Sequence, residues 1–335
     1  MSFFAVLFAL LLEQARPLAR DNWVHAALQR WARWARRSLD AGKSHHGWIA
    51  WTSAVLAPTL LTMLVYWLLG LVNGVLAFVW SVAILYVTLG FRQFSHYFTD
   101  IRDALDDGHE DAARELLAEW RQVDASELPR SEIVRHVIEY SVLAAHRHVF
   151  GVLVWFSVLA ALNLGPAGAV LYRMSEFVAR YWTYRQSLPG DSASPALQQV
   201  AGRTWGLIDF VPARATALGF AVVGSFEDAI DAWRNYSQQF PDEMVAVTAR
   251  HNDGIILAAT SGAVNVRLGG QVLKPVFSPS VPSADAPGGD LDITDSMPGR
   301  EPEVAHLRSV VGLVWRSVVL WMVLLALLTL ARLIG

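Results

Sequence analysis

The chain has 335 residues, of which 54% are hydrophobic and 17% are charged, and its formal net charge is -3 at pH 7. This composition, which includes 14 tryptophans, is typical of a polytopic membrane protein, and the net charge gives no argument for nucleic-acid binding. Because the sequence has no cysteine, disulfides, thiolate metal sites and cysteine nucleophiles are excluded.

The N-terminal 47 residues combine a short apolar run with a basic segment. Ser2–Leu12 is too short to span a bilayer alone, so it either forms a tilted half-span or lies in the interface. In Leu28–Arg37, Trp and Arg residues alternate around a predicted helix. Residues 13–47 carry seven Lys or Arg against three acids, so the positive-inside rule places this segment on the cytoplasmic side.

Residues 48–91 form the strongest apolar stretch. No Lys, Arg, Asp or Glu occurs between Lys43 and Arg92, a length about twice the roughly 20 residues that one transmembrane helix needs. Gly70–Gly74 interrupts the middle of this run. The stretch therefore predicts a transmembrane hairpin with helices near Trp48–Leu69 and Val75–Phe91.

Residues 92–148 are predicted to form a cytoplasmic helical segment. Ile101 and Leu105 followed by Gly108 indicate a short helix with a glycine stop, and Asp111–Trp120 indicates a second helix. A third helix is predicted to start at Ser131 and to continue into the membrane.

Residues 149–277 open with another uncharged run, Val149–Tyr172, which Asn163–Gly168 interrupts. A single span here would put the following arginines outside, against the positive-inside rule. A broken or re-entrant helix that folds back at Gly165 and Pro166 keeps them inside and is the favoured interpretation. Leu207–Val223 is apolar but contains two charges, so it is predicted to be amphipathic or partly inserted.

The C-terminal part is predicted to be a linker followed by a membrane helix. Residues 278–303 are rich in Pro, Gly, Ser and acids, a composition typical of a flexible linker. Residues 304–335 contain the last apolar run, Val310–Ile334, which is long enough to span. The predicted fold is an all-α, polytopic helical integral membrane protein with four or five spans, amphipathic or re-entrant helices and helical cytoplasmic segments.

Charged side chains in apolar surroundings are the candidate functional residues. Arg135 and Glu139 are four residues apart and share one face of a predicted helix. Asp209 and Arg214 lie five apart in an apolar segment. Each set predicts a structural ion pair. Alternatively, several arginines together form an anion or phosphate site, because a guanidinium binds phosphate bidentately; these are Arg135, Arg173, Arg203, Arg214 and Arg267. No metal-binding pattern is present, so no metal site is predicted.

Several sequence motifs permit a comparison with known proteins. Val211-Pro212-Ala213-Arg214, with Arg203 upstream, resembles the R-x-x-x-x-x-x-W-V-P-A-R segment of the CobD/CbiB family of cobalamin-biosynthesis membrane proteins. Asn252-Asp253-Gly254 and the downstream Val266-Arg267-Leu268-Gly269-Gly270 are similar to its N-A-G and V-R-L-G-G signature. Further similarities cover Gly108–Arg114 and Gly165–Arg173, so the resemblance runs in order from about Phe91 to about Arg316.

The resemblance implies a reaction and a set of site residues. Family members join an amino-alcohol phosphate to adenosylcobyric acid through an amide bond, which implies activation of a carboxylate by ATP with Mg²⁺. On this view Glu139 is the catalytic acidic group, and Asn252 with Gly254 forms a backbone-rich turn. The residues expected to contact substrate are Arg135, Arg173, Arg203, Asp209, Arg214, Asn252, Gly254 and Arg267.

The chain also departs from that family's pattern. The family's E-S-V-A-E-N-T-x-D-G run falls on Glu139–His148, where only the first Glu is kept, and its N-T-L-D falls on Glu176–Ala179. The opening and the eroded acidic site resemble the AmpE family of inner-membrane regulatory proteins instead.

The sequence is therefore consistent with two functions, and a transporter is disfavoured. The first is the amide-forming ligase, with a corrinoid substrate or other cobalamin-pathway membrane proteins as partners. The second is a non-catalytic role in envelope signalling and β-lactamase induction. Both imply a multi-pass protein of the bacterial inner membrane, embedded in the lipid bilayer.

Overall fold

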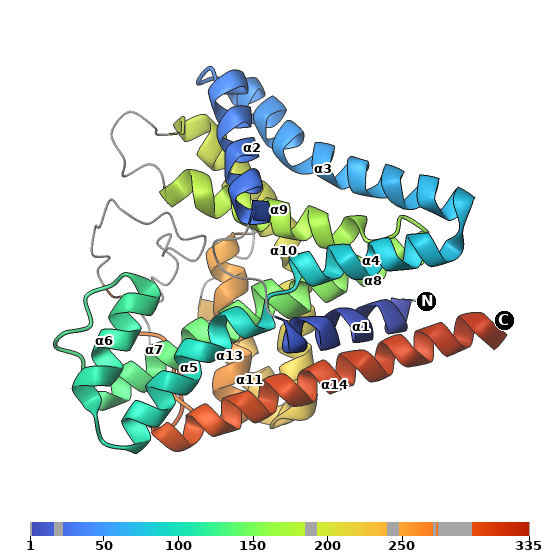
Figure 1. Cartoon of the computed structure of the whole chain (residues 1–335). Helices are drawn as coiled ribbons and strands as arrows, with labels where there is room; N and C mark the ends of the chain where they lie inside the picture. The colour runs from blue at the N-terminus through green and yellow to red at the C-terminus, as the bar shows by residue number, and fades with distance from the viewer. Residues whose placement is uncertain are drawn as a thin grey trace. The chain divides into compact units, whose positions relative to one another are not determined.

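The computed structural model describes residues 2–16, 23–184, 193–239, 248–270, 273 and 297–334. Regular structure in these ranges is helical (Figure 1), apart from one isolated parallel bridge between Val266 and Arg300. The chain divides into two compact units. The first comprises Met1–Gln93, Arg147–Pro212 and Trp321–Gly335, and the second comprises Phe94–His146 and Ala213–Leu320.

Four helical stretches in the described residues are long and apolar enough to cross a membrane. They are Ser44–Val72, Arg130–Ala161, Pro195–Val223 and Val304–Ala331. Two shorter apolar helices, α1 (Ser2–Ala15) and α4 (Gly74–Thr88), accompany them. The prediction of an all-α polytopic membrane protein is confirmed, and the lipid bilayer is its solvent.

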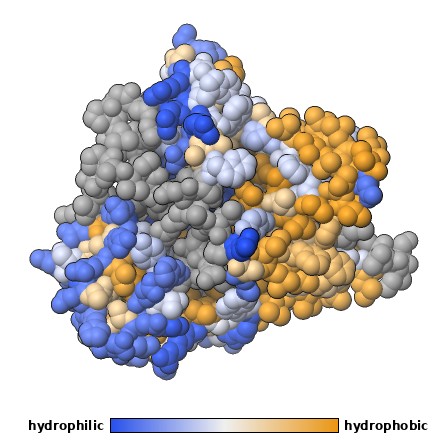
Figure 2. Space-filling model, viewed as in Figure 1, coloured by the Kyte–Doolittle hydropathy of each residue, from blue (hydrophilic) through white to orange (hydrophobic). Residues whose placement is uncertain are grey.

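The predicted hairpin is present in the first unit. Helix α3 (Ser44–Val72) and α4 are antiparallel neighbours joined at Asn73, whose side-chain Oδ1 accepts a hydrogen bond from the Val75 amide at 2.8 Å. In Figure 2, hydrophobic residues gather over this hairpin. Its outward side chains include Leu61, Leu64 and Leu71, which are more than half exposed. Such a surface is stable only when lipid covers it.

Tryptophans join the helices of the first unit through their indole N–H groups. Trp31 of α2 (Trp23–Leu39) donates to the Ala54 carbonyl of α3, and Trp182 of α9 (Ala167–Tyr184) donates to Ala32 of α2. Trp80 in α4 likewise donates to Thr62 in α3. Because a buried indole N–H needs an acceptor, these bonds let large apolar rings pack between helices without an unsatisfied donor.

The predicted break near Gly165 and Pro166 is confirmed. Helix α8 (Gly151–Ala161) ends before a turn in which Asn163 and Gly165 both have a φ of 60°, and α9 then packs back along α8. A side chain at Gly168 would meet the Trp155 carbonyl oxygen at 2.0 Å, so only glycine permits this close return.

The second unit is built on helices that the sequence largely predicts. Helices α5 (Phe91–Asp106) and α6 (Glu110–Arg121) flank Gly108, whose φ of 79° ends the first of them. Helix α7 (Arg130–Ala145) follows and continues through a π-helical turn, His146–Phe150. Helix α10 (Pro195–Val223) contributes its C-terminal end, and α14 (Val304–Ile334) its N-terminal part.

Helices α11 (Phe226–Gln239) and α13 (Ala249–Val264) form the closest pair in this unit. An added Cβ at Gly262 would lie 2.3 Å from the Asp228 carbonyl oxygen, so the two backbones are in direct contact there. Beyond α13, the extended Val266–Gly270 strap is held by backbone bonds: the Arg267 amide donates to Arg300, and the Met297 amide donates to Leu268.

The predicted division of the chain into six segments stays a prediction. Each of the two compact units is assembled from separate stretches of the chain. Of the predicted linker at residues 278–303, residues 278–296 lie outside the described part of the structure.

We predict opposite effects for two glycine substitutions in the second unit. Gly262→Ala forces α11 and α13 apart and lowers stability by roughly 1–3 kcal/mol. Gly219→Ala, in α10, meets no atom within 4 Å and gains up to about 1 kcal/mol from helix propensity. Thermal midpoints of the detergent-solubilised protein measure both, and an equal effect of the two substitutions contradicts the packing described.

Candidate functional site

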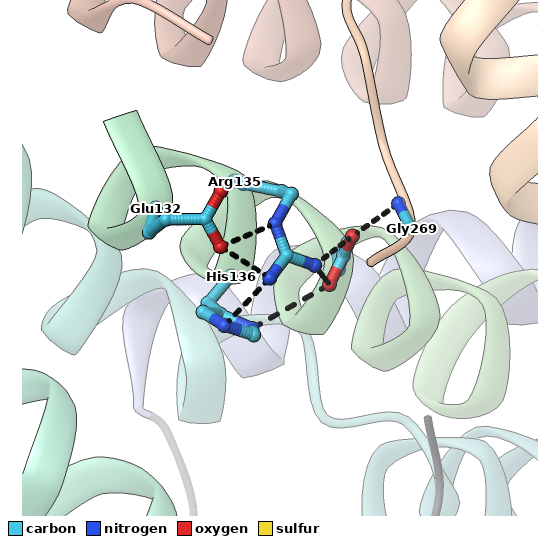
Figure 3. A network of polar contacts seen from close by, with 5 residues as sticks. Glu132, Arg135, His136 and Gly269 are labelled. Carbon is cyan, nitrogen blue, oxygen red and sulfur yellow. Dashed lines mark hydrogen bonds and ion pairs between the residues drawn. The ribbon is translucent and has the colours of Figure 1, made fainter. Parts of the chain in front are cut away.

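A buried polar network on α7 contains the two residues that the sequence predicts to pair (Figure 3). The Arg135 Nη1 atom donates to both carboxylate oxygens of Glu139, at 3.0 and 3.2 Å, and the Arg135 Nε atom donates to Glu132 at 3.0 Å. Arg135 and Glu139 are 3% and 2% exposed. The predicted i,i+4 ion pair is therefore present and buried.

His136 completes this network. Its Nε2 atom lies 3.0 Å from the Arg135 Nη2 atom, and because a guanidinium can only donate, this ring nitrogen accepts. We infer that the ring proton is then on Nδ1, which faces Glu139 at 3.6 Å. Glu139 thus has positive or donor groups on two sides.

Glu139 also holds a segment far away in the sequence. The Gly269 amide donates to the Glu139 Oε1 atom at 2.7 Å, and Gly270 lies against the Arg135 guanidinium. Gly269 and Gly270 have φ values of 79° and 121°, a backbone conformation that favours glycine. With its oxygens engaged by Arg135 and by a backbone amide, Glu139 is arranged to fix the Val266–Gly270 strap in place.

A second polar group surrounds the first turn of α13. The Arg214 Nη1 atom donates to the Asn252 Oδ1 atom at 3.1 Å, so two predicted substrate-binding residues do meet. His251 lies beside them against the Tyr236 ring and is 1% exposed. Neither of its ring nitrogens has a hydrogen-bond partner in the described residues. Burial and the Arg214 charge lower the pKa of His251 to about 4.

The expected turn at Asn252 and Gly254 is wrong, because both residues lie inside α13. An added Cβ at Gly254 would lie 1.9 Å from the Tyr236 hydroxyl oxygen, so this glycine admits the tyrosine of α11. The Asn-Asp-Gly sequence suggests a turn, but helix packing decides the conformation here.

In the first unit, α9 carries a buried carboxylate held by two arginines. Arg173 donates to the Glu176 Oε2 atom at 3.0 Å, and Arg180 donates to Oε1 at 2.8 Å. Burial alone would raise the pKa of Glu176, but these guanidiniums outweigh it and lower the pKa to about 2. Glu176 is therefore an anion at neutral pH, and it forms an ion pair with Arg173.

Asp209 lies in the same unit, on α10, and is 1% exposed. The Tyr172 hydroxyl donates to its Oδ1 atom at 2.8 Å. Burial and this carboxylate raise the pKa of Tyr172 well above its ordinary value, so the phenol keeps its proton and remains a donor. An added Cβ at Gly151 would lie 2.0 Å from the Tyr172 ring, so that glycine makes room for the tyrosine.

The π-helical turn His146–Phe150 contains Arg147, which stands where the resembling family has an Asp. The His146 Nδ1 atom lies 2.8 Å from the Thr216 hydroxyl in the second unit. Arg147 and His148 are buried in the first unit. A π-turn widens the helix and is frequent at functional sites, so Arg147 lies in a structurally unusual segment.

The remaining predicted arginines have other surroundings. Arg203 is exposed on α10, and Arg267 is exposed on the strap after α13. Of the five arginines proposed to share an anion, Arg173 and Arg203 belong to the first unit, and Arg135, Arg214 and Arg267 to the second. Arg135 contacts Glu132 and Glu139, and Arg214 contacts Asn252. The anion site that these arginines were predicted to share stays a prediction.

Sequence reasoning missed two residues that the structure makes prominent. Glu176 sits three residues after Arg173 and four before Arg180, a spacing that places both cations beside it on a helix and was available in the sequence. His251 had no such signal, because its burial depends on Tyr236 and Arg214 from other helices. Among the described residues, no group of three His, Asp or Glu side chains is arranged to hold a metal ion.

We predict that Glu139→Ala is more destabilising than its size suggests. It leaves Arg135 buried with one carboxylate fewer and removes the acceptor of the Gly269 amide, so we expect a loss of about 3–5 kcal/mol. Glu139→Gln, which keeps an acceptor, costs less. The Arg135→Ala and Glu139→Ala double variant loses less than the sum of the single losses.

The control for this cycle is Asp231→Ala, which breaks the exposed pair with Arg234 and changes stability by less than about 1 kcal/mol. Chemical or thermal unfolding of the solubilised protein measures all five variants. Additive losses for Arg135 and Glu139 contradict a coupled pair.

We also predict a pH dependence that comes from His251. Its pKa is about 4 in the folded chain and about 6.5 when unfolded, so between these values the unfolded state binds more protons. Stability therefore falls as pH drops from about 6.5 to about 4. His251→Phe removes this part of the slope in a thermal melt recorded across pH, and an unchanged slope contradicts the assignment.

Comparison with known proteins agrees with the family resemblance that the sequence motifs indicate. The CobD/Cbib protein family model matches residues 3–280. The chain is 28% identical over 331 residues, 96% of each chain, to the cobalamin biosynthesis protein CobD of Stutzerimonas stutzeri (strain A1501). It is 31% identical over 189 residues to the protein of the same name from Chromobacterium violaceum, covering 56% of this chain and 55% of that one. No solved structure matches with significance. This chain belongs to the CobD/CbiB family.

Proposed function

We propose that this protein forms the amide bond between the carboxylate of adenosylcobyric acid and the amine of an amino-alcohol phosphate. The observation that carries the proposal is the family match over residues 3–280, together with a relative that is similar along 96% of both chains. Cobalamin biosynthesis is the role that the names of these relatives state.

The proposed reaction requires anion binding, because both substrates carry an oxyanion. ATP would transfer its terminal phosphoryl group to the carboxylate and leave as ADP. Attack by the amine would then form the amide bond and release inorganic phosphate, which carries away one carboxylate oxygen. The proposed substrate-binding residues are Arg203, Arg214, Asn252 and Arg267. The other predicted site residues act as positioning residues, because their contacts are made to other parts of the protein; these are Glu139, Arg135, Gly254, Arg173 and Asp209.

Three buried carboxylates, those of Glu139, Glu176 and Asp209, do not fit a resident Mg²⁺ ion. Glu139 and Glu176 are each engaged by guanidinium groups, and Asp209 accepts from Tyr172. Mg²⁺ prefers oxygen ligands and is commonly held by one or two carboxylates together with substrate phosphates. We therefore propose that ATP and Mg²⁺ arrive together as the nucleotide complex, and we assign no step to a protein-held metal.

The site of action is proposed to be the cytoplasmic side of the bacterial inner membrane. The basic helix α2, with Arg30, Arg33, Arg36 and Arg37, supports this side through the positive-inside rule. Partners on this membrane are the corrinoid substrate and other membrane proteins of the cobalamin pathway.

The competing role, AmpE-like envelope signalling without catalysis, is favoured by one observation. Leu143, Ala144 and Arg147 stand where the family's pattern has Glu, Asn and Asp. An enzyme that lost those groups and gained no others would be inactive. Glu176 and Asp209 are buried carboxylates in the same unit as Arg147, which supports retained chemistry.

We predict that deleting the gene from a cobalamin-synthesising host stops formation of adenosylcobinamide phosphate and leads to accumulation of adenosylcobyric acid. The intact gene restores the product, and Arg214→Ala restores less than about a tenth of it. Mass spectrometry of the corrinoid pool measures this. Unchanged cobinamide formation together with altered β-lactamase induction would establish the signalling role instead.

A further inference from the structure

The second unit has an open polar pocket of about 700 Å³ at the end of α11. Asn235, Gln238 and Gln239 line one side of it. Their i, i+3 and i+4 spacing puts the three carboxamides on one helix face. The opposite side is formed by Arg267 and by Met297–Gly299. All of these residues belong to the same compact unit.

Arg267 is the charged group of this pocket. Its side chain is exposed, and no hydrogen bond or ion pair engages its guanidinium in the described residues. The carboxamides around it are neutral, so no carboxylate in the lining neutralises it. An Arg with five donors facing open space is suited to bind an oxyanion from solution.

The backbone beneath Arg267 is fixed although the side chain is exposed. Its amide donates to the Arg300 carbonyl at 2.7 Å, and the neighbouring Leu268 carbonyl accepts from Met297. Gly299, with a φ of 152°, lies so close to Val266 that an added Cβ would be 2.5 Å from its carbonyl carbon. On the other side, Glu139 holds Gly269. A surface arginine on so restrained a segment presents its charge in one place.

We propose that this pocket binds the carboxylate-bearing corrinoid substrate, with Arg267 contacting the carboxylate and the three carboxamides contacting the amide groups around the ring. The volume is far larger than a phosphate ion or an amino-alcohol phosphate requires, so it fits a bulky ligand. Asn and Gln side chains each offer donors and an acceptor, which matches a ligand whose periphery carries primary amides. The identity of this ligand rests on the proposed function.

The test measures binding of cobyric acid and of cobinamide, in which the same carboxylate has become an amide. Equilibrium dialysis against full-length protein in nanodiscs, followed by corrin absorbance, gives both affinities. We expect the unsubstituted protein to prefer cobyric acid. Arg267→Gln weakens cobyric acid binding roughly ten- to one-hundred-fold and leaves cobinamide binding nearly unchanged. Arg267→Lys retains part of the preference.

The matched control is Arg234→Gln, which removes an exposed arginine from α11 that does not line the pocket. An unchanged thermal midpoint for both variants shows that they fold. If Arg267→Gln binds both corrinoids as the unsubstituted protein does, the proposal is overturned. It is also overturned if the variant loses only affinity for aminopropanol phosphate, since the pocket then holds the phosphate. If the preference for cobyric acid over cobinamide depends on Arg267 but the protein forms no amide product, the pocket is supported and the proposed reaction is rejected.

Discussion

The buried contact between Arg135, Glu139 and the Gly269 amide is the constraint on which the second unit depends. An unpaired charge at 2–3% exposure would cost several kcal/mol, so each member requires the others. The bond from Glu139 to Gly269 joins positions 130 residues apart, and it fixes the strap that follows α13. Arg267 lies two residues before this anchor, so a buried structural pair restrains the backbone that carries an exposed arginine.

Helix spacing made part of this arrangement predictable from the sequence. Arg135 and Glu139 are one turn apart, and the hairpin of α3 and α4 follows from an uncharged run too long for one helix. The fold-back before α9 was predicted from charge distribution and from Gly165. These features are local, because hydropathy and side-chain periodicity within one segment decide them.

Contacts between distant segments were not predictable in the same way. The sequence Asn252-Asp253-Gly254 has turn-forming residues, yet it lies in α13 because Gly254 receives Tyr236 from α11 and Gly262 touches Asp228. The value of these glycines lies in close packing rather than in backbone freedom. Likewise, nothing near Glu139 in the sequence indicates Gly269 as a partner.

The arginines differ in function according to what already neutralises them. Arg135 and Arg173 each face a buried carboxylate on their own helix, so their charge is used within the fold. Arg267, by contrast, faces an open pocket lined by neutral amides. A neutral amide orients a guanidinium without cancelling its charge, whereas a carboxylate cancels it. The guanidinium of Arg267 is therefore not neutralised by the residues that line its pocket.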